Sequence, residues 1–388
     1  MNLVERTLEH LKERRDKLLN GGINSIPSPF RRFSTEFIGI EQGKYYCITG
    51  ATKSGKTQFA SFVFLYNTLL YAYEHPDKAR IKVFYYSLEE NPEDVTKRFM
   101  SYLINCFTDG HYRISPTDLE STDNSRPVPE EVLKLLEDND IKDRLEFFEN
   151  HIVFSPSRNA TGVYNEVKKY MEEHGTVHKR PQLIKDELGN TKEEQVFDWY
   201  EPNDPDEYVI VFFDHLSLIR TERGLTLKQS ADKLSEYFVI LRNRYKVTPV
   251  LVQQQSFEME SLDAFKSNKL RPTAQGLADS KYTSRDCNVL LGLFNPFKHE
   301  IPEYQKYDIT KLKDHCRFLE VILNRGGSSG GIVGLYFDGA TCNWAELPKP
   351  DSREIHNVYS FIEELRRPSL VLLVHGVINF IKNLYSKF

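Results

Sequence analysis

The sequence has few cysteines, little net charge and no long uninterrupted apolar run. Its five cysteines are scattered over 388 residues and form no C-x-x-C pair, which argues against a zinc site or a disulfide framework and favours a reducing compartment. The net charge of −5 argues against a protein that coats nucleic acid through bulk positive charge, although a local basic channel remains compatible with it.

Membrane association is also not indicated. The N-terminal stretch MNLVERTLEHLKERR is charged throughout and lacks the apolar core of a signal peptide. The longest apolar stretch covers residues 370–381 and is interrupted by His375, Gly376 and Asn379, so it is shorter than the roughly 20 residues that span a bilayer. We therefore expect a cytoplasmic protein with no membrane partner, in the host cytoplasm if it is encoded by a phage.

What the sequence does contain is a series of short apolar runs separated by helical stretches. The hydrophobic share of 40% supports a sizeable core and excludes a disordered or collagen-like chain. We expect strands at residues 44–49, 81–87, 151–154, 208–213, 248–253, 289–294, 318–323 and 332–337. Nearly continuous apolar strands of this kind predict an α/β fold with a central, mostly parallel sheet and helices on both faces.

The segments around this core are of a different character. Residues 1–42 are expected to form an amphipathic linker helix, with Val4, Leu8, Leu11 and Leu18 on one face, followed by a short link. That helix packs either on its own domain or on a neighbouring subunit. The core is assigned to residues 43–347, with an acidic insertion at about 109–143 and an inserted hairpin or long loop at about 177–206. Residues 348–388 are assigned to a C-terminal helical tail.

Residues 50–57, GATKSGKT, match G-x-x-x-x-G-K-[ST] between an apolar strand and an amphipathic stretch. In such a P-loop, backbone N–H groups and the start of the following helix surround the phosphates of ATP. Lys56 is expected to reach the β- and γ-phosphates, and the Thr57 hydroxyl to ligate Mg²⁺. The residues expected to hold the nucleotide are Gly50, Ala51, Thr52, Lys53, Ser54, Gly55, Lys56, Thr57 and Gln58.

Hydrolysis also requires carboxylates near the metal and the attacking water. Asp214 ends the apolar strand YVIVFFD, a Walker B pattern, and is expected to hold Mg²⁺ together with Thr57, partly through water. The next residue is His215, where many ATPases place the catalytic Glu. The base is therefore expected from Glu89, with Glu90 as the alternative, after a strand that can lie beside the P-loop strand.

These motifs together resemble the ATPase domain of DnaB-like replicative helicases, which are RecA-like motors. The stretch VFYYSLEENPEDVTKRFMSYL resembles that family's strand ending in S-L-E and the helix with a central Arg, which implies that Glu89 is the base. FFDHLSLI is similar to D-Y-L-x-L-I, with His215 replacing Tyr. TPVLVQQQS resembles P-V-x-x-L-S-Q, so the γ-phosphate sensor falls on Gln255, with Gln254 as the alternative.

The resemblance continues to residue 347. RPTAQGLADSKYTSRDCNVLLGLF is similar to the family's R-P segment, and FLEVILNRGGSSGG resembles its strand ending in K-x-R-x-G-x-x-G. This implies that Arg325 is an arginine finger that reaches a neighbour's γ-phosphate. The family's finger Lys is Leu323 here, so either Arg325 acts alone or Arg317 or Lys313 compensates. The family's N-terminal collar domain has no counterpart in the roughly 42 residues before the core.

In RecA-like motors the loops after Walker B and after the sensor strand line the central channel. Residues of these loops that could contact DNA phosphates are Arg220, Arg223, Lys228, Lys266, Lys269 and Arg271. The acidic Glu258, Glu260 and Asp263 argue against a uniformly basic surface, and ordinary solvated loops are the alternative. For Arg271, a structural role in the R-P segment is the alternative.

The resemblance thus implies an ATP- and Mg²⁺-dependent DNA helicase that forms a ring, expected to be a hexamer, and moves on single-stranded DNA in replication. Nucleotide is expected between subunits, and replisome proteins are among the expected partners. The alternative is a RecA- or KaiC-like ATPase that acts as a recombinase or switch without unwinding DNA.

Overall fold

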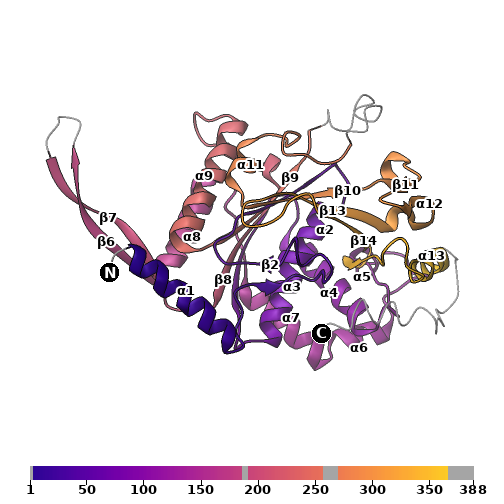
Figure 1. Cartoon of the computed structure of the whole chain (residues 1–388). Coiled ribbons are helices and arrows are strands. Elements are labelled where there is room, and N and C mark those ends of the chain that lie inside the picture. Colours follow the sequence, from indigo (N-terminus) through magenta and orange to yellow (C-terminus); the bar gives the residue numbers. More distant parts are fainter. Residues whose placement is uncertain (1–2, 186–190, 257–269, 366–388) are drawn as a thin grey trace.

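A nine-stranded sheet forms the centre of the structure (Figure 1), a computed structural model that describes residues 3–185, 191–256 and 270–365. The strand order is β15-β14-β13-β10-β3-β9-β8-β4-β5. The strands are β3 (Tyr46–Gly50), β4 (Arg80–Ser87), β5 (Ile152–Phe154), β8 (Glu207–Asp214), β9 (Thr248–Gln254), β10 (Val289–Phe294), β13 (Cys316–Asn324), β14 (Ile332–Asp338) and β15 (Asn343–Glu346).

The pairing confirms the predicted fold class. The six strands from β10 to β5 are parallel to one another, and β13, β14 and β15 add an antiparallel C-terminal meander to β10. Each of the eight predicted strands is present. β15 is an additional short strand of four residues, which completes the C-terminal β-hairpin.

Helices cover both faces of the sheet. Successive side chains of a strand point to opposite sides, and in these apolar strands both sides are hydrophobic and need to be covered. Tyr46 and Ile48 of β3 face a core built with helices α2 (Lys56–Ser61), α3 (Asn67–Glu74), α4 (Pro92–Phe107) and α7 (Asn139–His151). The π-helical segment η1 (Phe62–Tyr66) joins α2 to α3 on the same side. Tyr45 and Cys47 face the second core, which α8 (Ala160–Glu173) and α9 (Leu227–Tyr245) complete.

One expectation about strand order is wrong. β4, the strand that leads to Glu89, does not lie beside the P-loop strand β3, because β9 and β8 stand between them. Burial explains this order: β8 and β9 are almost entirely buried, whereas β4 begins with partly exposed Arg80 and Lys82. The most apolar strands take the centre of the sheet, and the crossover from α3 places β4 nearer the edge.

The predicted N-terminal helix is α1 (Leu3–Leu19), and none of its residues is buried. It lies near the base of a long hairpin, β6 (Gly175–Lys185) and β7 (Thr191–Pro202), that projects away from the body (Figure 1). Of the two forms considered for residues 177–206, the structure has the hairpin. Two short strands, β1 (Ile26–Pro27) and β2 (Gly39–Ile40), pair in the link that follows α1.

The acidic segment at 109–143 forms α5 (Pro116–Leu119), α6 (Glu130–Leu136) and the start of α7, and it buries Val132 and Ile141. In the tail, α13 (Ile355–Glu364) packs through Ile355, Val358 and Ile362 on a third apolar cluster, and residues 366–388 lie outside the described part. The remaining short elements are η2 (Leu216–Leu218), α11 (Tyr282–Asp286), η4 (Phe297–His299), β11 (Glu303–Tyr304), β12 (Tyr307–Asp308), α12 (Ile309–Leu312) and η5 (Lys313–His315). Within the described residues, no helix has the length and apolar character to cross a bilayer.

Candidate nucleotide site at the carboxyl edge of the sheet

The P-loop connects β3 to α2 in a conformation that its glycines permit. A Cβ on Gly50 would lie 2.5 Å from the Leu293 carbonyl oxygen and 2.7 Å from the Ser54 hydroxyl. Gly55 has φ +90°, a left-handed conformation that glycine adopts without a steric penalty. The turn is closed by the Ser54 N–H, which donates to the Ala51 carbonyl at 3.2 Å. The loop therefore curls tightly before α2 begins at Lys56.

Two polar groups of this loop fit a phosphate ligand. The Ser54 hydroxyl is buried and has no hydrogen-bond partner in the described structure. The Lys56 ammonium lies inside the curl and donates to the Ala51 carbonyl at 2.7 Å, with only 7% of the residue exposed. A buried cation beside a ring of backbone N–H groups at a helix start suits a polyphosphate.

Asp214 lies opposite the P-loop at the end of β8. Its carboxylate accepts a hydrogen bond from the Thr57 hydroxyl at 3.3 Å, and only 6% of the residue is exposed. Burial raises the pKa of Asp214 to about 7, while the Thr57 hydrogen bond acts in the opposite direction. A buried carboxylate next to a hydroxyl is an oxygen donor set that suits Mg²⁺, and a bound cation would favour the ionised carboxylate.

The turn after β4 brings Glu89 to the same place although β4 is distant from β3. Ser87 of β4 pairs with Asp214 of β8, and the Leu88 N–H donates to the Asp214 carbonyl at 3.0 Å. The Glu89 carboxylate lies 3.7 Å from Nε2 of His215, with 67% of its side chain exposed. Glu89 therefore stands beside the metal-side carboxylate and is open to solvent.

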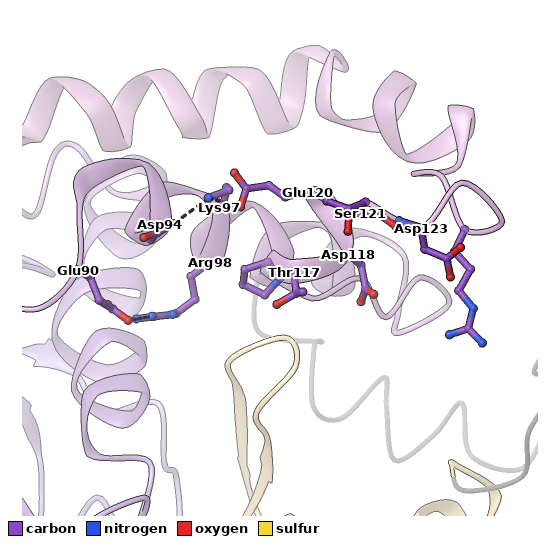
Figure 2. Close-up of a pocket in the computed structure, with 12 residues that line it drawn as sticks. Glu90, Asp94, Lys97, Arg98, Thr117, Asp118, Glu120, Ser121 and Asp123 are labelled. Atoms are coloured by element: carbon purple, nitrogen blue, oxygen red, sulfur yellow. Dashed lines mark hydrogen bonds and ion pairs between the residues drawn. The ribbon is translucent and has the colours of Figure 1, made fainter.

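Glu90, the alternative base, is held differently. Its backbone N–H and carbonyl both bond to the Ser87 hydroxyl, at 2.9 and 2.6 Å, and its carboxylate forms an ion pair with Arg98 of α4. Only 12% of the Arg98 side chain is exposed. Figure 2 shows this pair at one end of a cleft of about 560 Å³ that α4 and the α5 region line. These contacts give Glu90 a structural partner, and the role of base stays a prediction for Glu89.

The three consecutive glutamines at the end of β9 and just after it differ in their surroundings. Gln255 is nearly buried next to the P-loop, where its backbone N–H donates to the Gly50 carbonyl at 3.1 Å and its side-chain amide donates to the Thr49 hydroxyl at 2.9 Å. Gln254, the alternative, lies across the ladder from Gly50 and is partly exposed. Gln253 is fully buried and donates to the Ser280 carbonyl at 2.7 Å. Gln254 and Gln255 thus both remain next to the P-loop, with the role of sensor still a prediction.

Arg325 lies far from the P-loop of its own chain. It follows β13, whose last residue Asn324 pairs with Val289 of β10, and Val289 pairs with Tyr46 at the start of β3. The P-loop begins at the other end of β3, roughly 13 Å further along at about 3.3 Å per residue. The exposed guanidinium is fixed by bonds to the carbonyls of Cys287, at 3.0 Å, and Arg285. This position suits contact with a different subunit.

Arg317 and Lys313, considered as substitutes for the missing finger Lys, lie at the opposite end of β13 from Arg325. Arg317 is 2% exposed, donates to the Ser54 carbonyl at 2.8 Å, and its guanidinium carbon lies 4.6 Å from the centre of the Phe337 ring. It therefore supports the P-loop of its own chain. Sequence reasoning missed this contact because Ser54 and Arg317 are 263 positions apart.

Two of the predicted DNA contacts, Arg220 and Arg223, lie in the described loop after Walker B, and a third, Lys228, lies in the first turn of α9. Arg220, Arg223 and Lys228 are all exposed, and the loop between them is anchored by Glu222, which accepts from the Thr161 N–H at 2.8 Å. Arg271 instead forms an ion pair with Glu320 of β13 at 2.5 Å, which gives it a structural partner. Lys266 and Lys269 fall outside the described residues.

Comparisons with known proteins agree with the fold. A search of protein-family models finds no match to this sequence, and a search of curated proteins finds none. The structure is similar to a solved ATPase domain, with a TM-score of 0.62 and 15% identity over 90% of this chain and 100% of that one. The chain has the fold of a RecA-like P-loop ATPase domain.

Two further solved structures are similar. A DnaB-like replicative helicase, solved in a study of its interactions with primase, has a TM-score of 0.59 and 15% identity over 89% of this chain and 67% of that one. A KaiC-like protein from the hyperthermophilic archaeon Pyrococcus horikoshii has a TM-score of 0.44 and 12% identity over 84% of this chain and 99% of that one.

Proposed function

We propose that this protein is an ATP-driven DNA helicase of the DnaB-like type, which works as a ring on single-stranded DNA in replication. One observation carries the proposal: Lys56, Thr57, Asp214 and Glu89 meet at the carboxyl edge of the sheet, while Arg325 stands at the opposite edge. Such a site is completed by a second copy of the chain, which supplies Arg325.

The proposed chemistry follows from these positions. The P-loop N–H groups and Lys56 bind the phosphates of ATP, and Thr57 with Asp214 would hold Mg²⁺, which neutralises charge on the phosphates when bound. Glu89 orients a water molecule for attack and accepts its proton. Arg325 of a neighbouring subunit stabilises the charge on the transferred phosphoryl group, and its planar, permanently charged guanidinium group suits this role. Gln255 couples the phosphate end of the site to the segment that follows β9.

Ring formation is supported by α1. The apolar residues Leu3, Val4, Leu8, Leu11, Leu18 and Leu19 are each between 53% and 71% exposed. The other side of the helix faces its own chain, where Arg6 lies 3.5 Å from Asp198 of β7 and Lys17 pairs with Asp206. Exposed apolar side chains on one side of an ordered helix are characteristic of an interface, and we assign this side of α1 to an adjacent subunit.

Strand displacement tests the proposal. With ATP and Mg²⁺, the protein should separate a forked DNA duplex, and single-stranded DNA should stimulate its ATPase activity. If the fork remains duplex while single-stranded DNA still stimulates hydrolysis, the recombinase or switch function replaces the helicase. If the purified chain does not hydrolyse ATP at all, both functions are refuted.

A matched pair of charge changes tests the channel assignment. Reversing the exposed Arg223 to Glu should weaken single-stranded DNA binding and reduce the dependence of binding on salt. Reversing Arg271, which is paired with Glu320, should mainly lower stability. Equal effects of the two changes on DNA binding and on stability would contradict the assignment.

A further inference from the structure

His215 is the residue at which this chain departs from the D-Y-L-x-L-I pattern, and it is next to Asp214 in the chain and close to Glu89 in space. It directly follows Asp214, and its Nε2 lies 3.7 Å from the nearer oxygen of Glu89. Only 12% of the imidazole is exposed, compared with 67% of the Glu89 side chain. A buried ring therefore meets an exposed carboxylate, and the ring is the more firmly placed of the two.

We propose that His215 is a positioning residue for Glu89, in which the Nε2–H holds the carboxylate next to Asp214 and narrows the orientations open to it. This inference rests on the proposed role of Glu89 as the base. A side chain as exposed as Glu89 otherwise samples several rotamers, and fixing it before reaction lowers the entropic part of the barrier. At 3.7 Å the two atoms are beyond hydrogen-bond distance, and the proposed bond forms when the site tightens around its substrate, as catalytic contacts often do.

The surroundings of the ring indicate which nitrogen faces Glu89 with a proton. Nδ1 of His215 is buried without a hydrogen-bond partner in the described structure, while Nε2 points to the carboxylate. A proton on Nδ1 would be buried without an acceptor and would leave the Nε2 lone pair facing the carboxylate, so the tautomer with its proton on Nε2 is favoured.

Two substitutions of His215 by amide side chains of different length test this inference. In His215→Gln the side-chain NH₂ falls near the position of Nε2, whereas in His215→Asn it falls near Nδ1 and does not reach Glu89. We expect the Asn variant to lose about 10- to 100-fold in kcat with an unchanged KM for ATP, the range associated with a misplaced catalytic group. The Gln variant should retain kcat within several-fold of the natural protein. Thermal unfolding and fluorescent-nucleotide binding should be alike in the two variants.

A double-mutant cycle separates this inference from the proposed function. If His215 acts through Glu89, then His215→Asn causes no further loss in single-turnover hydrolysis once Glu89 is already Gln. The inference is overturned if the Asn variant keeps its normal kcat, if Gln and Asn lose equally, or if the loss is the same in the Glu89→Gln background. Near-normal hydrolysis by Glu89→Gln alone would instead refute Glu89 as the base, and the inference would fall with it.

Discussion

Replacing Asp214 by Asn should stabilise the nucleotide-free protein while it abolishes Mg²⁺-dependent hydrolysis. Burial raises the pKa of this carboxyl from 3.8 to about 7. At about 1.4 kcal/mol per pH unit, its ionisation at pH 8 costs the folded chain up to about 4 kcal/mol more than the unfolded chain. Asn has nearly the same shape and carries no charge, so the substitution removes this cost.

The sign of the pH dependence follows from the raised pKa. Well below pH 3.8 the carboxyl is protonated in both the folded and the unfolded chain, so it contributes nothing to the pH dependence of stability. As the pH rises, the unfolded chain ionises first, and the cost grows until the folded carboxyl ionises near pH 7. The advantage of Asn should therefore be about 4 kcal/mol at pH 8, about 2 kcal/mol at pH 5 and close to zero below pH 4.

Urea unfolding of the natural protein and the Asp214→Asn variant at pH 5 and pH 8, without nucleotide or Mg²⁺, measures this difference. Asp338→Asn is the matched control. That carboxylate is also buried, but Arg113 binds both of its oxygens at 2.6 Å and holds its pKa below the ordinary value. The control should lose about 1–3 kcal/mol. A loss of stability in Asp214→Asn at pH 8, or a gain that does not shrink at pH 5, would refute the electrostatic account of the site.

Three further predictions concern binding, catalysis and assembly. Lys56→Ala should abolish ATP hydrolysis, measured as phosphate release, because it removes the buried ammonium of the P-loop. Normal turnover in this variant would exclude the loop as the nucleotide site. Glu89→Gln should bind ATP and lose turnover. Glu90→Gln should keep turnover and lose about 1–3 kcal/mol of stability, because it weakens the ion pair with Arg98. The reverse pattern would make Glu90 the base. Changing Leu8 and Leu11 of α1 to Ser should lower the oligomeric state measured by light scattering, whereas the control Lys12→Ser, on the same helix, should leave it unchanged. An unchanged oligomeric state in the Leu8 and Leu11 variant would contradict the role of the apolar side of α1.

The fold and the P-loop could be predicted because their signals are local. Each parallel strand is a compact apolar run of at least three residues, and the run preceding GATKSGKT places the phosphate loop by itself. Asp214 is likewise marked by the buried strand that it ends. For these parts of the molecule, the residue pattern predicts the local structure, but it does not predict the position of each strand in the sheet.

What could not be predicted depends on contacts between distant residues. The order β3-β9-β8-β4 is decided by competition among apolar strands for the centre, which no single segment encodes. The ion pair that distinguishes Glu90 from Glu89 depends on Arg98, and the support of the P-loop by Arg317 depends on the approach of β13 to Ser54. Of these two side-chain contacts, the one made by Arg98 has a signal in the sequence, because the helix that carries Arg98 directly follows the S-L-E stretch.

The central claim is that the ATPase site is shared between two copies of the chain, and mixing two inactive variants tests it most directly. Subunits with Arg325→Ala keep an intact P-loop, and subunits with Lys56→Ala keep an intact arginine finger, Arg325. In mixed oligomers, some sites combine the intact Lys56 of one subunit with the intact Arg325 of the next. We predict that ATPase activity returns in the mixture, with a maximum at an intermediate ratio. No activity at any ratio, in mixtures shown to co-assemble, would contradict the shared site.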